Sequence, residues 1–192
     1  MTFADMEWLN PPPVCTTGPA GLSVTTGPAT DFWRETFYGF TRDSGHFLHH
    51  PVTGDFSVRV TITARYEALY DQAGLMLRLS ESHWIKAGVE LTDGQPMFST
   101  VVTNGRSDWA TTPLTSASPL TLRLTRHAEA IRIDLREASS IWRMARLAYL
   151  PPDSPAHIGI MACSPEREGF TATFSDYHCG PAIPRTLHEA HE

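Results

Sequence analysis

The side chains best suited to chemistry in this sequence lie between residues 84 and 90. Read with the period of two that strands have, this stretch has one apolar face and one mixed face. The apolar face carries Ile85, Ala87 and Val89, and the mixed face carries Trp84, Lys86, Gly88 and Glu90. Residues two apart on a strand project from the same face about 6.5–7 Å apart, so Lys86 and Glu90 can flank a bound molecule while Gly88 leaves space for it.

Lys86 and Glu90 form the candidate catalytic pair. Lys86 is the only lysine in the chain of 192 residues. An ammonium group near a carboxylate suits acid–base chemistry or hydrogen bonding to a polyol. A lysine shielded from bulk water can also have a lowered pKa and act as a base or an amine nucleophile. The alternative is a cross-strand ion pair on a solvated sheet face.

The preceding strand adds polar groups on one face. Gln72 and Arg78 share that face, and we expect them to bind a ligand beside Trp84 and Lys86, with the amide and the guanidinium as hydrogen-bond donors. Asp71 has the opposite parity near the strand start. This position favours a structural role for Asp71, as the cap of a turn.

Two tryptophans in expected loops complete the candidate ligand-binding set. Trp33 and Trp109 each have an aspartate as a near neighbour, Asp31 and Asp108 respectively. An indole ring can stack on the apolar face of a sugar, although buried tryptophans more often belong to a core. The aspartates can bind ligand hydroxyls or cap the loop backbone. We include Trp33, Trp109 and Asp108 among the candidate ligand-binding residues.

Motifs for other chemistries are missing from the sequence. His46 and His50 share a strand face, but a metal site needs a further ligand, so we predict no metal and no cofactor. Glu90 lacks an evident acidic partner at the spacing of a retaining glycosidase. The sequence also has no calcium-type acidic run, no glycine-rich phosphate loop and no Gly-x-Ser-x-Gly elbow.

Short alternating segments predict the elements that must position these residues. Clear strand patterns cover residues 56–63, 70–79, 84–91, 97–103, 120–125, 131–136, 158–163 and 170–177. Residues 142–150 have a mixed pattern that indicates a further strand, although 141–147 would also tolerate a helix. Residues 106–109 indicate a loop, and 1–30 are expected to be irregular apart from a short edge strand at 22–26. We therefore predict an all-β fold, a two-sheet antiparallel jelly-roll sandwich, with one domain over residues 1–180 and a polar tail over 181–192.

Composition narrows the range of partners and compartments. The formal net charge of −6 argues against nucleic acid, because binding to its phosphates needs a cationic surface. No apolar run is long enough to cross a membrane, so we expect no membrane partner. The first residues lack a signal peptide, which predicts a cytoplasmic protein whose Cys15, Cys163 and Cys179 are free thiols. The sequence gives no prediction of the oligomeric state.

Four motifs in one order resemble the regulation-of-enolase family, whose common domain is described as of unknown function. They are Thr30-Asp31-Phe32-Trp33, Tyr70-Asp71-Gln72-Ala73-Gly74-Leu75, Trp84-Ile85-Lys86-Ala87-Gly88-Val89-Glu90 and the run from Val101 to Trp109. The resemblance covers roughly residues 5–180. It implies a concanavalin A-like lectin/glucanase jelly roll and, given the arginine-rich composition, we expect a bacterial member. It implies no settled activity and no catalytic residues.

Three functions fit these observations. The first is binding of a small polar ligand, a sugar, polyol or related metabolite, on the concave face of the jelly roll. The second is a small-molecule enzyme, a lyase, isomerase, cyclase or glycoside hydrolase, that uses Lys86 and Glu90 as an acid–base pair. The third is a regulatory module that binds another protein, which predicts a shallow concave face and an exposed apolar patch elsewhere.

Overall fold

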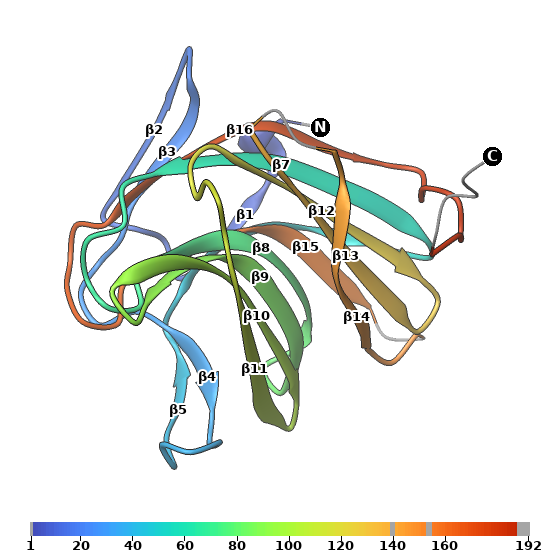
Figure 1. Ribbon diagram of the computed structural model, residues 1–192, viewed down its shortest axis with the longest axis horizontal. Helices are drawn as coiled ribbons and strands as arrows, with labels where there is room; N and C mark the ends of the chain where they lie inside the picture. Colours follow the sequence, from blue (N-terminus) through green and yellow to red (C-terminus); the bar gives the residue numbers. More distant parts are fainter. Residues whose placement is uncertain (1, 139–140, 153–154, 188–192) are drawn as a thin grey trace.

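Two curved antiparallel sheets face each other in the computed structural model, which describes residues 2–138, 141–152 and 155–187 (Figure 1). Sheet A contains, in spatial order, β1 (Glu7–Leu9), β6 (His46–Val52), β15 (Ala156–Cys163), β8 (Gln72–Ser80), β9 (His83–Thr92), β10 (Gln95–Asn104) and β11 (Arg106–Pro113). Sheet B contains β14 (Arg143–Tyr149), β13 (Ala130–Glu137), β12 (Leu120–His127), β7 (Phe56–Ala64), β16 (Thr171–Gly180), β3 (Gly21–Thr25) and β2 (Val14–Gly18). The predicted all-β class with two antiparallel sheets is confirmed.

The core lies between the two sheets and follows from the alternation of apolar residues. On β7, Val58, Val60 and Ile62 are fully buried and point toward sheet A. On β9, Ile85 and Val89 face them from the other layer. Because successive side chains on a strand point to opposite faces, this burial turns the mixed face of β9 away from the core.

The first 30 residues and the segment after β10 differ from the predictions. Three strands, β1, β2 and β3, lie in the segment expected to be mostly irregular, and β2 rather than β3 forms the edge of sheet B. Residues 106–109, predicted to be a loop, begin β11, which pairs with β10 from Asn104↔Arg106 to Met97↔Pro113. Gly105 has a φ of 76° in the tight turn between them, so Asn104-Gly105 is a hairpin turn rather than the end of the sheet. The strand predicted at 142–150 is confirmed as β14.

A small hairpin lies on the outer side of sheet A. Its strands are β4 (Phe32–Arg34) and β5 (Thr41–Asp43), and Figure 1 shows it projecting from the body of the sandwich beneath β8, β9 and β10. A single 3-10 turn, η1 (Phe3–Asp5), precedes β1. The sheet face covered by this hairpin is the face that carries Lys86 and Glu90.

The described residues contain no helix that is long and apolar enough to cross a membrane. All three cysteines are free. Residues 188–192 of the predicted polar tail lie outside the described residues.

Candidate functional site

Lys86 and Glu90 lie on the outer face of sheet A, as the alternation predicts, and both are buried. Their exposed fractions are 4% and 6%. The hairpin β4–β5 and the neighbouring strand β11 cover them, so this outer face is not a solvated sheet surface. The two side chains form the floor of a pocket of about 120 Å³.

Lys86 is fixed by two partners on different elements. Its Nζ donates to Gln72 Oε1 on β8 at 2.7 Å and forms an ion pair with Asp31 Oδ1 at 3.1 Å. Asp31 comes immediately before β4, so the ion pair ties the hairpin to the centre of sheet A. Gln72 Nε2 donates to the backbone oxygen of Tyr70 at 3.3 Å, which orients its amide oxygen toward Lys86.

The electrostatics of Lys86 contradict the predicted lowered pKa. Burial by itself lowers the pKa of an ammonium group, but the negative charges around Lys86, first of all Asp31, outweigh it and raise its pKa above the ordinary value. Lys86 is therefore a fixed cation at neutral pH. In this charged form it can hold a ligand oxygen or stabilise negative charge.

Glu90 has one occupied and one open carboxylate oxygen. Its Oε2 accepts hydrogen bonds from Ser99 Oγ at 2.5 Å and from Trp109 Nε1 at 3.2 Å. Among the described residues no donor is bonded to Oε1. Burial raises the pKa of Glu90, and this effect exceeds the opposite effects of Lys86, Ser99 and Trp109. Glu90 can therefore accept a hydrogen bond from a ligand or exchange a proton with it.

Asp31, which also lines the pocket, has a second carboxylate oxygen without a described donor. Its Oδ1 accepts from the backbone nitrogen of Phe32 at 2.8 Å and from Gln72 Nε2 at 3.4 Å, in addition to its bond with Lys86. No described residue donates to its Oδ2. Asp31 therefore has the structural role weighed for it, since it accepts from the backbone of its own loop, and it also lines the pocket.

Five aromatic side chains contribute to the pocket wall. Of the predicted ligand-binding residues, Trp33, Gln72 and Trp109 line the pocket together with Lys86 and Glu90. Asp31, for which ligand binding was one of two possible roles, also lines the pocket. The remaining lining residues were not expected there: Tyr38, Phe40, Arg42, Tyr70, Val101, Pro165 and Glu166. The Tyr38 and Tyr70 hydroxyls are 3.0 Å apart, and this bond raises the pKa of Tyr70 to about 12, with burial adding to the effect. The aromatic density of residues 32–40 was the available signal for Tyr38 and Phe40.

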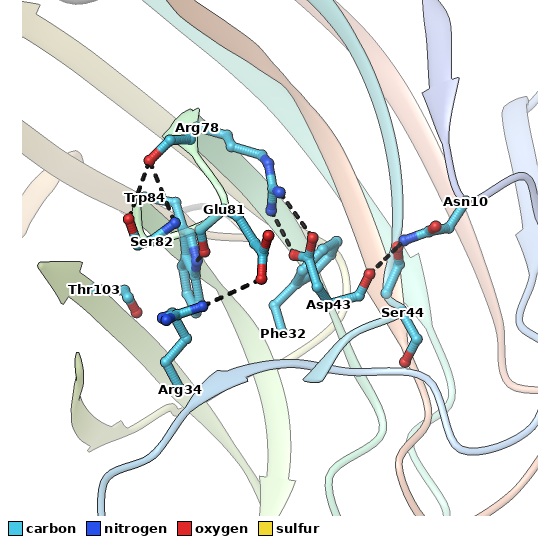
Figure 2. A network of polar contacts seen from close by, with 12 residues as sticks. Asn10, Phe32, Arg34, Asp43, Ser44, Arg78, Glu81, Ser82, Trp84 and Thr103 are labelled. Carbon is cyan, nitrogen blue, oxygen red and sulfur yellow. Dashed lines mark hydrogen bonds and ion pairs between the residues drawn. The ribbon is translucent and has the colours of Figure 1, made fainter. Parts of the chain in front are cut away.

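Arg78 does not line the pocket, contrary to the prediction. Its guanidinium forms two hydrogen bonds to the carboxylate of Asp43, at 2.6 and 2.8 Å, at the base of β5 (Figure 2). Asn10 Nδ2 donates to the backbone oxygen of Asp43, and Arg34 pairs with Glu81 on the β8–β9 turn. Arg78 is therefore an anchor of the hairpin rather than a ligand donor.

Trp84 does not line the pocket either. It shares a face with Lys86 as predicted, but it is 1% exposed, and its Nε1 donates to the backbone oxygen of Glu81 at 3.1 Å. Phe32 at the start of β4 covers it, with ring centroids 6.2 Å apart. The Lys86 Nζ lies 5.9 Å from the indole centroid, so Trp84 makes a cation–π contact with the lysine without lining the pocket.

Asp108 lies outside the pocket because residue 108 belongs to a strand, where it has the opposite parity from Trp109. Its side chain is 69% exposed and pairs with Arg146 on β14 at 3.3 Å. Asp71 confirms its predicted structural role, since its Oδ2 accepts from the backbone nitrogens of Glu67 and Ala68. Arg167 also forms an ion pair with Asp71.

Gly88 is needed for close packing of two strands, and not, as expected, to leave space for a ligand. It pairs with Gly74 across β8 and β9, and a Cβ on Gly88 would lie 2.1 Å from the backbone oxygen of Ala73. The glycine therefore permits the close approach of two strands, and the space for a ligand comes from the arrangement of the pocket walls.

The histidines considered as metal ligands have structural partners. His46 Nε2 accepts from the backbone nitrogen of Gly27 and its Nδ1 bonds to the oxygen of Asn10. His50 Nε2 lies 2.8 Å from the Tyr177 hydroxyl. Across the described ranges, no group of three or more histidine, cysteine, aspartate or glutamate residues is arranged to hold a metal ion.

Comparison with known proteins finds fungal relatives. The "Regulation of enolase protein 1" of Saccharomyces cerevisiae is 43% identical over 183 residues, which cover 95% of this chain and 92% of that protein. A crystal structure of a functionally unknown protein from Saccharomyces cerevisiae superposes with a TM-score of 0.91 at 41% identity, covering 96% of this chain and 100% of that one. These relatives give no support to the expected bacterial source.

A more distant likeness concerns the fold alone. The carbohydrate-binding module CBM66 from Bacillus subtilis superposes with a TM-score of 0.55 at 16% identity, covering 90% of this chain and 94% of that one. The resemblance seen in the four sequence motifs is confirmed by a family model that matches residues 8–182. The chain thus belongs to the family described as "Protein of unknown function (DUF1349)".

Proposed function

We propose that this protein binds a small polyhydroxylated molecule, a sugar or polyol, in the pocket above Lys86 and Glu90. The observation that carries the proposal is the set of polar atoms on the floor. Asp31 Oδ2 and Glu90 Oε1 are acceptors without a described protein donor, and they lie beside a fixed ammonium group. A ligand that presents several hydroxyl groups can donate to both carboxylates and accept from Lys86.

The walls fit the other side of such a molecule. Trp33 is 9% exposed and Trp109 is 39% exposed, and both line the pocket. Sugars combine hydroxyl groups with apolar CH faces, and indole rings provide a flat apolar surface for those faces. The likeness in fold to a carbohydrate-binding module supports the same ligand class. The pocket volume of about 120 Å³ is below the roughly 300–1,000 Å³ usual for ligand sites, so the pocket can seat only a very small molecule or the end of a larger one.

Calorimetry against a panel of monosaccharides, sugar alcohols and sugar acids tests the proposal. We expect one group of related compounds to bind the wild-type protein. Glu90→Gln and Lys86→Met should each weaken this binding about 10- to 100-fold, the loss of a hydrogen bond to a charged group. Asp93→Asn is the matched control, since Asp93 is an exposed acid in the β9–β10 turn of the same sheet. No binding by any compound, or binding that Glu90→Gln and Lys86→Met leave unchanged, would contradict the proposal.

The raised pKa of Glu90 favours a second candidate, acid–base catalysis on the same kind of ligand. In this reading Glu90 exchanges the proton through its open oxygen, and Lys86 stabilises negative charge on the substrate without losing its own proton. The test is one-dimensional NMR of each panel compound during long incubation with the protein. Slow conversion that disappears in Glu90→Gln, measured at a compound concentration high enough to saturate the weaker-binding variant, supports catalysis. Unchanged spectra for compounds that bind support a binding protein.

A further inference from the structure

The tip of the β4–β5 hairpin exposes aromatic rings at the mouth of the pocket. Phe37 is 93% exposed, Tyr38 47% and Phe40 37%. The Phe37–Tyr38 rings are 5.1 Å apart edge to face, and the Tyr38–Phe40 rings are stacked at 5.3 Å. A phenylalanine held in water contributes nothing to the core, so the stability of the sandwich does not explain this residue.

The backbone of the tip is also held in an uncommon conformation. Glu35 and Phe37 have φ angles of 58° and 65°, in the left-handed region that bulky residues rarely adopt. Hydrogen bonds from Glu35 N to Phe40 O and from Gly39 N to Glu35 O close the turn and keep the Phe37 ring outside. Strain of this kind persists where a surrounding structure enforces it, and it is concentrated at ligand contacts.

A second, wider hollow lies beside the pocket and shares part of its wall. It has a volume of about 590 Å³, and Trp33, Tyr38 and Trp109 line both spaces. Phe37 and Asp108 line only the second hollow. The predicted ligand-binding role of Asp108, which the pocket itself does not support, is thus compatible with a place in this outer space.

The polar floor decides the direction in which a ligand can extend. Lys86, Gln72 and Glu90 are buried on the sheet and close the pocket at that end. The hollow lined by Phe37 adjoins the pocket at Trp33, Tyr38 and Trp109. The second unit of a longer ligand that follows Trp109 away from the floor therefore reaches the exposed Phe37 ring.

We infer that the ligand is the terminal unit of an oligosaccharide or glycoside, whose second ring lies in the outer hollow against Phe37 and Trp109. This inference rests on the proposed function of the pocket. The aromatic faces bind the apolar face of the second ring, and the Asp108 carboxylate, 69% exposed, is placed to accept from its hydroxyl groups.

The test uses calorimetry to compare each monosaccharide with short oligosaccharides built from the same sugar. The sets are xylose with xylobiose and xylotriose, glucose with cellobiose and maltose, and fructose with its short β-linked oligomers. We expect one disaccharide to bind about five- to tenfold more tightly than its monosaccharide. Phe37→Ala should remove this gain and leave the monosaccharide affinity unchanged. Tyr149→Ala is the control, because Tyr149 is an exposed aromatic residue on β14 of the other sheet, 56% exposed.

The outcomes separate the two proposals. Monosaccharide binding that depends on Lys86, with no gain for any disaccharide, leaves the pocket proposal standing and overturns the inference. A disaccharide gain that survives Phe37→Ala also overturns it. If no monosaccharide and no oligosaccharide binds, both the proposed function and this inference are overturned. Phe37 is almost fully exposed, so its substitution tests binding without disturbing the core.

Discussion

The outer faces of the two sheets each hold a buried acid, and their surroundings differ. On sheet B, Asp134 is fully buried, and both of its oxygens are occupied. Arg123 binds Oδ2 through two nitrogens at 3.1 and 3.0 Å, and Arg132 binds Oδ1 at 2.8 Å. On the outer side of sheet A, Glu90 on β9 and Asp31 at the start of the covering hairpin each keep one oxygen without a described partner, and both residues line a pocket. A saturated buried acid holds strands together, whereas an unsaturated one beside a pocket is ready for a ligand.

The two sheet faces also differ in how far positive side chains compensate their buried acids. Asp134 has two arginines, so its negative charge is more than compensated on the face of sheet B. On sheet A a single lysine serves Asp31 directly and Glu90 at longer range. The shortage of positive charge is one reason why the Glu90 pKa is raised by its burial. We therefore expect substitutions on sheet B to change stability and those on the floor of sheet A to change binding.

The largest expected effect is that of Asp134→Asn. The substitution leaves Arg123 and Arg132 without their common carboxylate, and breaking a buried ion pair in this way costs about 3 kcal/mol of unfolding free energy. Urea denaturation measures the loss. Sugar affinity, measured below the unfolding transition, should stay at the wild-type value. If Asp134→Asn is as stable as the wild type but binds sugar more weakly, the outer face of sheet B, and not only that of sheet A, has a role in binding.

A middle-sized effect is expected at the anchor of the hairpin. Arg78→Ala removes both bonds to Asp43, which should cost about 1.5–3 kcal/mol locally. Hydrogen exchange of the amides in residues 32–43 should accelerate, and ligand binding should weaken although Arg78 does not line the pocket. Arg106→Ala is the matched control: its ion pair with Glu35 is at the surface, with exposed fractions of 77% and 44%, and should contribute little. Equal exchange rates in Arg78→Ala and wild type would remove Arg78 from this role.

Strand alternation predicts which face of β9 carries the site. Burial of Ile85, Ala87 and Val89 in the core forces Lys86 and Glu90 to the other side, and a period of two is enough to establish this. The same pattern predicts the two-sheet fold. These predictions succeed because they depend on local alternation and on the burial of apolar surface.

The position of the hairpin could not be predicted in the same way. Whether Arg78 binds a ligand or Asp43, and whether Trp84 is open or covered by Phe32, depends on where residues 31–43 contact residues 72–90. Such contacts between distant segments leave no periodic signal. The error at Asp108 has a local cause: residue 108 lies on a strand rather than in the expected loop, and strand parity turns its side chain away from that of Trp109.

The smallest expected effect on stability, and the one that most sharply tests the unsaturated acid, belongs to Glu90→Gln. Because burial raises the folded-state pKa of Glu90 above its ordinary 4.5, the folded protein binds this proton more tightly than the unfolded chain does. The favourable contribution of the protonated carboxyl is fully present below pH 4.5 and is lost as the pH rises through the folded-state pKa. The amide in Glu90→Gln does not titrate, so the variant should match the wild type at acidic pH and become the more stable of the two toward neutral pH. Urea titrations at a series of pH values measure this difference, in which the other titrating groups cancel. A difference that stays constant with pH would mean that Glu90 is as well satisfied as Asp134, and the contrast between the two sheet faces would then not hold.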